Sequence, residues 1–234
     1  MPSQKGILDN PENPIEDIRK RFIKWYESKP KDIGNIIRIA LGEYKRSSDW
    51  MKTAYYAHQA TGGMSAGNGS LMRCLPVAYY YSDAEKMLEI TASQSVLTHY
   101  DKKATDACQF YSLLVYQYLN DKPKIPAIRE HIEKYPEYKQ VFQLSKDELK
   151  PSGYVFYTLI CVLWCFINTS SFEDAVCGAA NLGGDSDTIA AIVGGMAGVY
   201  YGYNAIPDRW KNKILVKDQL TSIAQRIVRD NGKT

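Results

Sequence analysis

Two carboxylates and a hydroxyl follow a pair of adjacent glycines between residues 181 and 188, which read Asn-Leu-Gly-Gly-Asp-Ser-Asp-Thr. The glycines permit a tight turn and close approach of the backbone to a ligand. Asp185, Asp187 and Thr188 then open a predicted helix, and such hard oxygen ligands suit Mg²⁺ or Mn²⁺. The same helix N-terminus favours phosphate. The alternative is simple capping of the helix by Asp185 or Ser186.

Glycines inside the following helix argue against a purely capping role. Gly194, Gly195 and Gly198 each lower helix stability by about 1 kcal/mol, so we expect them to permit close packing of helix on helix. Such packing would bury the whole segment. A buried helix that opens with Asp185 and Asp187 needs a partner for their charges.

A second glycine-containing segment has the composition of a phosphate-binding or sugar-binding turn. It reads Gly-Asn-Gly-Ser from residue 67 and precedes a predicted helix. Backbone N–H groups around Gly69 could hold phosphate oxygens. The side chains of Asn68 and Ser70 could form hydrogen bonds to a sugar or a phosphate. The alternative is a surface turn before a helix.

Two further positions carry groups that suit a ligand site. His99 lies between two predicted helices and could donate a hydrogen bond to a phosphate or ribose; the alternative is a structural histidine at a helix end. Gly153 and Tyr154 enter an apolar helix, where the glycine permits close approach and the tyrosine could stack or donate. The alternative there is a turn followed by a core aromatic residue.

Helical signals dominate the chain and position these candidates. The predicted helices are one that starts at Pro14 after an Asn13 cap; one capped by Asp32; one opened by Ser48 or Asp49; 71–81, with Pro76 as a kink or a new first turn; 82–97, with Ser82 and Glu85 as a capping box; 103–119; 154–168; one from Ser171; 186–201; and an amphipathic last helix over 214–228.

Between these helices, residues 61–69 hold four glycines and predict a loop. Residues 121–152 are charged, contain four prolines and predict short helices with a linker. Alternation of polar and apolar residues, the sign of a strand, is found nowhere at useful length. The predicted fold class is therefore all-α, in a single domain over residues 1–234.

Composition excludes several classes of function. A net charge of +3 over 234 residues is too slight to indicate nucleic acid or an acidic membrane as partner. The five cysteines contain no C-x-x-C pair, which favours reduced, buried thiols over zinc or disulfides. The N-terminus has no secretory signal, and the apolar stretch from Tyr154 to Ile167 is too short to cross a bilayer. We expect a cytoplasmic protein, with the nucleus as the alternative.

These features, in this order, resemble the ADP-ribosylglycohydrolases, the family that includes dinitrogenase reductase-activating glycohydrolase. Residues 68–73 look like the family's NGSLMR segment, and Thr98-His99 looks like its TH step. Residues 152–164 are similar to its SGYV…LW helix, and residues 181–202 to its NLGGDxDT…YYG signature. The segment from Trp25 to Gly34 is similar to an early part of the family pattern.

The resemblance implies an orthogonal bundle of helices that holds two adjacent Mg²⁺ or Mn²⁺ ions and binds ADP-ribose. It implies a hydrolase that removes ADP-ribose from a modified protein or small molecule, with metal-assisted cleavage of the C1″ glycosidic bond. Asp185 and Asp187 would be catalytic through the metal, and Thr188 would be a third ligand. The implied substrate-binding residues are Asn68, Gly69, Ser70, His99, Gly153, Tyr154, Gly183 and Gly184.

The sequence departs from the family pattern in one respect. A glycine-rich GDALG-like helix and a (T/S)DDT motif are missing, and the sequence contains no adjacent pair of aspartates. We therefore expect an N-terminally truncated family domain whose metal site lacks half of its ligands. A hydrolase that needs those ligands is the first hypothesis. The alternatives are an inactive ADP-ribose-binding protein and a structural, crystallin-like relative.

Overall fold

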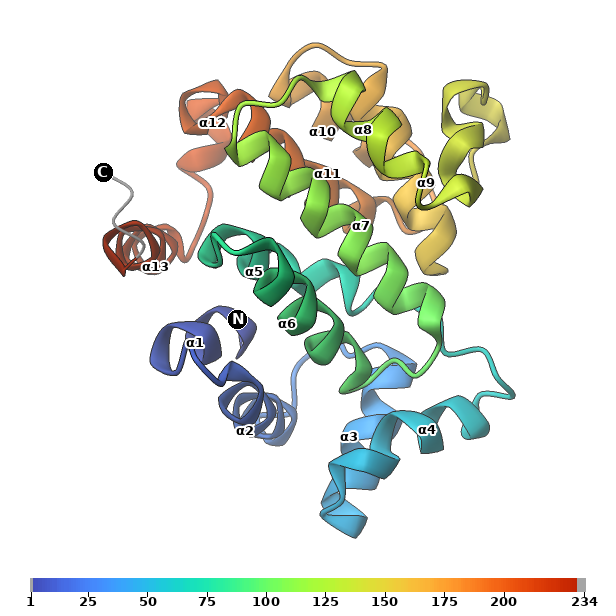
Figure 1. Cartoon of the computed structure of the whole chain (residues 1–234), viewed down its shortest axis with the longest axis vertical. Coiled ribbons are helices and arrows are strands. Elements are labelled where there is room, and N and C mark those ends of the chain that lie inside the picture. The colour runs from blue at the N-terminus through green and yellow to red at the C-terminus, as the bar shows by residue number, and fades with distance from the viewer. Residues whose placement is uncertain (1, 231–234) are drawn as a thin grey trace.

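The computed structural model describes residues 2–230, and this part of the chain folds into helices (Figure 1). The α-helices are α1 (Pro2–Asp9), α2 (Pro14–Glu27), α3 (Asn35–Ser47), α4 (Trp50–Ala60), α5 (Leu75–Tyr80), α6 (Ala84–Val96), α7 (Lys102–Leu119), α8 (Lys124–Ile132), α9 (Val155–Ile167), α10 (Phe172–Ala180), α11 (Ser186–Tyr201), α12 (Asp208–Lys211) and α13 (Lys217–Asp230). Short 3-10 helices are η1 (Leu71–Arg73), η2 (Pro136–Phe142), η3 (Lys146–Glu148) and η4 (Tyr203–Ala205). Within residues 2–230 no strand forms, which confirms the all-α prediction.

The core is built around α7, α9 and α11. Helix α7 packs on α5, α6, α8, α9 and α11, so it is the central element of the bundle. Its Phe110 and Tyr111 are fully buried, as are Leu159 and Leu163 of α9. Close packing that requires glycine is confirmed at Gly195, where a Cβ would lie 2.8 Å from Leu75 Cδ2. It is not found at Gly194 or Gly198, where a Cβ would make ordinary contacts at 3.5 and 3.8 Å. The contact at Gly195 holds helix α11 centrally, with its N-terminus at the surface of the bundle.

Two predicted helix caps differ from the structure. Helix α3 begins at Asn35 with Gly34 as its N-cap, so Asp32 is not a cap and lies in the preceding loop. Helix α6 is capped by Asp83, whose side chain accepts a hydrogen bond from Lys86 N, and not by Ser82. These errors share one cause: several oxygen-bearing side chains precede each helix, and sequence spacing alone does not select among them.

The remaining boundaries agree more closely with the predictions. The predicted helix over 71–81 is divided into η1 and α5, and Pro76 lies in the first turn of α5. Asp49 caps α4 and Ser171 caps α10 through their side chains. Residues 121–152 form α8, η2 and η3, as the charged, proline-containing composition predicted. Helix α1 was not predicted, because its eight residues are too few to show a clear apolar stripe.

The thiols agree with the prediction of reduced, buried side chains. Cys74, Cys108, Cys161 and Cys165 are buried, Cys177 is half-buried, and all five are free. Among the helices described, none is long and apolar enough to cross a membrane.

Candidate functional site

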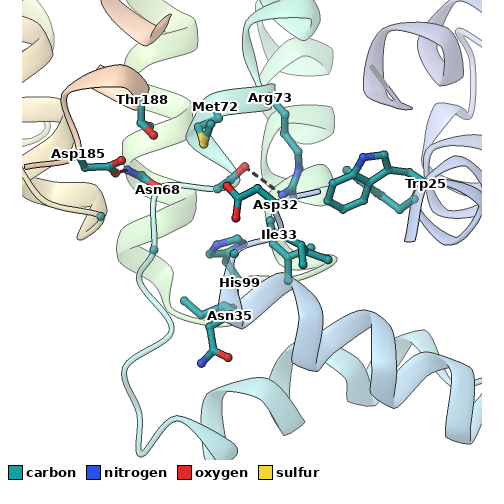
Figure 2. A pocket seen from close by; sticks show the side chains of 17 residues that line it. Trp25, Asp32, Ile33, Asn35, Asn68, Met72, Arg73, His99, Asp185 and Thr188 are labelled. Atoms are coloured by element: carbon teal, nitrogen blue, oxygen red, sulfur yellow. Dashed lines mark hydrogen bonds between the residues drawn. The ribbon is translucent and has the colours of Figure 1, made fainter. Parts of the chain in front are cut away.

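A cleft of about 640 Å³ brings together most of the predicted site segments. One wall comes from the end of α2 and the loop before α3, and the other from the 67–73 segment with Asp185 and Thr188 (Figure 2). His99 and Gly153 complete the lining. Residues more than 100 positions apart in the sequence therefore face one hollow.

Two backbone hydrogen bonds join the 67–73 segment to the start of α9. Asn68 N donates to Gly153 O at 3.0 Å, and Val155 N donates to Ala66 O at 2.9 Å. Together they form an isolated antiparallel bridge between Gly67 and Tyr154. This bridge fixes the two segments side by side at the edge of the cleft.

The Asn68 amide links three elements of the site. Its Nδ2 donates to Asp185 Oδ2 at 2.6 Å (Figure 2). The same nitrogen donates to Thr158 Oγ1 at 3.0 Å. Thr158 Oγ1 in turn donates to Ser152 O at 2.8 Å. Both amide hydrogens of Asn68 are therefore used within the protein. The result is a fixed orientation for the Asp185 carboxylate at the cleft wall.

The double-glycine turn places Asp185 at the head of α11. Gly183 and Gly184 have φ values of +77° and +56°, which confirms the tight turn predicted from the sequence. Asp185 N donates to Pro151 O at 3.4 Å, so the turn lies against the segment before α9. A Cβ at position 184 would overlap the Pro151 carbonyl oxygen, whereas a Cβ at 183 would meet open space.

His99 is buried beneath the 67–69 loop. The residue is 1% exposed, and Thr98 Oγ1 lies 2.8 Å from its Nδ1. A Cβ built at Gly69 would lie 3.4 Å from Nε2, so the histidine requires a small residue above it. Burial, with a smaller contribution from the charge of Arg73, lowers the pKa of His99 to about 3. The imidazole is therefore neutral at physiological pH.

Arg73 forms hydrogen bonds both to the 67–69 loop and to the residue before His99. Its Nη1 donates to Gly69 O at 3.1 Å, and its Nη2 donates to Thr98 Oγ1 at 2.9 Å. Burial lowers the pKa of Arg73 to about 10, which leaves the guanidinium charged at neutral pH. Because Arg73 donates to Thr98, the threonine hydroxyl can donate to His99 Nδ1, and Nε2 then carries the ring proton.

Comparison with known proteins identifies the family of this chain. A sequence profile of the ADP-ribosylglycohydrolase family matches residues 3–234. The chain belongs to the ADP-ribosylglycohydrolase family. A solved structure described as an ADP-ribosylglycohydrolase-related protein complex superimposes with a TM-score of 0.80 and 29% identity, covering 97% of this chain and 77% of that one. The predicted family and its all-α fold are confirmed.

Two curated relatives name the chemistry found in the family. The chain is 30% identical over 227 residues to an ADP-ribosylarginine hydrolase of Serratia proteamaculans, with 89% of this chain and 59% of the relative covered. It is 30% identical to the ADP-ribosyl-[dinitrogen reductase] glycohydrolase of Rhodospirillum rubrum, with 91% and 68% covered. This ADP-ribosylglycohydrolase chain thus spans about three fifths of the length of the first relative.

Sequence reasoning missed five polar or aromatic residues of the cleft, which are Phe22, Trp25, Asp32, Asn35 and Arg73. Asp32 and Trp25 both line it, together with Ile33 and Met72, and Asp32 points toward the middle of the hollow in Figure 2. Asp32 was assigned to a helix cap on spacing alone. The available signal was the resemblance of residues 25–34 to an early family segment, which indicated that this stretch mattered.

Several predicted residues lie outside the cleft wall. Ser70 is fully buried, and its hydroxyl accepts a hydrogen bond from Cys108 Sγ at 3.4 Å, so it supports the loop from below. Tyr154 lines a neighbouring hollow of about 500 Å³ with Gly67 and Gly153. Asp187 is exposed and, like the two glycines of the turn, does not line the cleft. Asp185 is thus the member of the predicted acidic pair that faces the hollow.

The residues that line the cleft do not complete the two-metal site that the family resemblance implies. Asp185, Thr188 and Asp32 offer oxygen atoms of the right chemical type. Within residues 2–230, however, no group of three or more histidine, cysteine, aspartate or glutamate side chains is arranged to hold a metal ion. The Asp185 carboxylate is instead oriented by an amide. The oxygen atoms in the cleft are of the type that binds a divalent metal, but they are too few to complete the site.

The neutral state of His99 predicts a pH-dependent stability. A base whose pKa falls from 6.5 in the unfolded chain to about 3 in the folded protein binds fewer protons when folded. The contribution of His99 to the free energy of unfolding is therefore fully present above pH 6.5. It decreases by about 1.4 kcal/mol per pH unit as the pH falls toward 3. Urea unfolding of the wild type and of His99→Gln at pH 7 and pH 5 measures this slope.

The comparison isolates the effect of His99 on the pH dependence of unfolding, because both proteins share every other titrating group. We expect the wild type to lose about 2 kcal/mol more than His99→Gln between the two pH values. Equal losses in the two proteins would show that His99 titrates as freely when folded as when unfolded.

Proposed function

We propose that the cleft binds ADP-ribose and that the protein removes ADP-ribose from a modified target by hydrolysis of the C1″ glycosidic bond. The contact of Asn68 with Asp185 carries this proposal. It joins the double-glycine turn, the 67–69 loop and the start of α9 around one hollow. Relatives named for hydrolysis of ADP-ribosylarginine and of ADP-ribosyl-[dinitrogen reductase] support the reaction class.

The lining supplies groups suited to each part of this ligand. The Arg73 guanidinium and the backbone around Gly69 favour a pyrophosphate. His99 Nε2, as a neutral donor below the loop, can position an oxygen of the phosphate or ribose. Tyr154, in the hollow beside the cleft, can stack with or donate to the remainder of the nucleotide. Asp185 orients the reacting end beside Asn68.

The opposite end of the cleft suits a guanidinium on the target side of the scissile bond. The Trp25 ring and the Asp32 carboxylate both line it, and an arginine side chain pairs well with an aromatic face and a carboxylate. ADP-ribosylarginine, free or on a protein, is therefore the proposed substrate class. Serine-linked and nucleic-acid-linked ADP-ribose are the other linkages to compare.

The Mg²⁺ or Mn²⁺ ions, two in number, remain part of the proposal. Asp185, Thr188 and Asp32 contribute oxygen atoms, and Asp187 lies two residues beyond Asp185 on the exposed side of the helix. Further oxygen ligands would have to join them before a metal could assist cleavage. A cytoplasmic site of action, with the nucleus as the alternative, is likewise a proposal.

A second candidate function is an ADP-ribose-binding protein without turnover. The observation that favours it is the incomplete ligand set among the described residues. Binding requires the loop, Arg73 and Asn68, all of which are in place. Turnover requires, in addition, a means of activating water.

Calorimetry with ADP-ribose and an assay of ADP-ribose release from ADP-ribosylated arginine test the proposal together. Each is run with EDTA, with Mg²⁺ and with Mn²⁺. We expect binding in all three conditions and release only with a metal. Binding without release under any condition would establish the second candidate. No binding at millimolar ADP-ribose would reject both and leave a structural role.

A further inference from the structure

Thr158 of α9 is fully buried and does not line the cleft, yet its hydroxyl is connected to it. Thr158 Oγ1 donates to Ser152 O at 2.8 Å and accepts a hydrogen bond from Asn68 Nδ2 at 3.0 Å. The same Asn68 nitrogen donates to Asp185 Oδ2 at 2.6 Å (Figure 2). A continuous chain of hydrogen bonds therefore links a backbone carbonyl to a carboxylate of the cleft.

This chain of hydrogen bonds can run in one direction only. A backbone carbonyl accepts and never donates, so the single hydrogen of the Thr158 hydroxyl goes to Ser152 O. Thr158 Oγ1 and the Asp185 carboxylate are then both acceptors toward Asn68. The reverse orientation of the Asn68 amide would place its oxygen against two acceptors. Thr158 thus determines which end of the amide faces Asp185.

Two oxygen atoms at this end of the cleft remain for a ligand. Asn68 Oδ1 and Asp185 Oδ1 form no hydrogen bond with any residue between 2 and 230, and both side chains line the cleft. Both atoms are acceptors, and the carboxylate carries negative charge. A phosphate is repelled by such a pair of atoms, whereas a hydroxyl group can donate to either of them.

On the basis of the ADP-ribose binding proposed above, we propose that Thr158 is a positioning residue that directs this end of the cleft toward the hydroxyl groups of the terminal ribose. Thr158 does not touch the ligand. It acts through Asn68, which holds Asp185 with its nitrogen and leaves its oxygen for the ligand. ADP has the same adenosine and pyrophosphate without the terminal ribose, so its binding does not involve this contact.

Calorimetry with ADP-ribose and with ADP tests this role, in EDTA so that no metal ion links ligand and protein. Thr158→Val keeps the shape of the side chain and removes the hydroxyl, and Thr158→Ser keeps the hydroxyl. We expect Thr158→Val to bind ADP-ribose about 10-fold more weakly, because Asn68 loses an acceptor and its fixed orientation. Its affinity for ADP should equal that of the wild type. Thr158→Ser should restore the affinity for ADP-ribose.

Thr91→Val provides the matched control. Thr91 of α6 is as buried as Thr158, its hydroxyl donates to Ser112 Oγ at 3.4 Å, and it does not line the cleft. This variant should bind both ligands like the wild type. Wild-type affinity of Thr158→Val for ADP-ribose would overturn the proposal. An equal loss for ADP-ribose and ADP would overturn it too, since it would indicate a general loosening of the fold.

The NMR signals of the Asn68 side-chain amide give a second readout that needs no ligand. Their loss in Asn68→Ala identifies them in a sample labelled with ¹⁵N at asparagine. In Thr158→Val, the hydrogen that faces position 158 should shift and exchange faster with solvent, and in Thr158→Ser it should not. Unchanged signals in Thr158→Val would overturn the positioning role. A wild type that binds neither ligand would reject the proposed function, and these signals would then decide the role of Thr158 alone.

Discussion

Replacing Gly184 with alanine is expected to unfold the site and to lower the melting temperature of the protein by about 10 °C. The residue has φ of +56°, and the added Cβ would overlap the Pro151 carbonyl oxygen. Left-handed strain costs about 1–2 kcal/mol, and relief of the overlap requires the turn to leave the segment before α9. Asp185 would then lose its position beside Asn68.

Gly183 provides the matched control for this variant. It also has a positive φ, of +77°, but a Cβ there has no atom within 4 Å. Gly183→Ala should therefore show the backbone strain alone, about 1 kcal/mol, and retain ADP-ribose binding. Thermal unfolding and calorimetry measure both effects. A Gly184→Ala protein as stable as Gly183→Ala would mean that the turn does not pack against Pro151.

Replacing Asp185 with asparagine is expected to lower the rate of ADP-ribose release by about 100-fold or more while ADP-ribose binding persists. Asparagine keeps the shape of the side chain and can still accept the hydrogen bond from Asn68. Only the negative charge at the cleft wall is removed. The variant therefore separates a chemical role of the carboxylate from a structural one.

Asp208→Asn serves as the control, because its carboxylate is 87% exposed and pairs with Lys211 on the surface. Its release rate should equal that of the wild type. Asp187→Asn addresses a separate question: a loss as large as that of Asp185→Asn would place the exposed carboxylate in the reaction. Undiminished release by Asp185→Asn would remove the proposed role of that charge.

Much of the site could be predicted because its signals are local. Adjacent glycines at 183 and 184 indicate a turn whatever their surroundings, and the structure has positive φ at both. The close packing expected at Gly195 is likewise present. The predicted segments around Asn68, His99 and Gly153 do line one cleft with Asp185.

The rest depended on tertiary contacts that spacing does not encode. Asp32 looks like a helix cap, and only the packing of the α2–α3 loop turns it toward the cleft. Asp185 and Asp187 are two residues apart, and the direction of each side chain follows from how the turn meets Pro151. Ser70 is of a residue type that suits a ligand site, yet its side chain is buried against Cys108 and supports the loop.

The Asn68 side chain has a consequence for how the protein folds. Its two bonds span 90 and 117 positions of the chain, so the cleft forms only after most of the polypeptide has collapsed into place. Local helices can appear early without creating any affinity for a nucleotide. Occupancy of the cleft is therefore coupled to the global folding equilibrium, and a ligand held there stabilises the whole bundle by mass action.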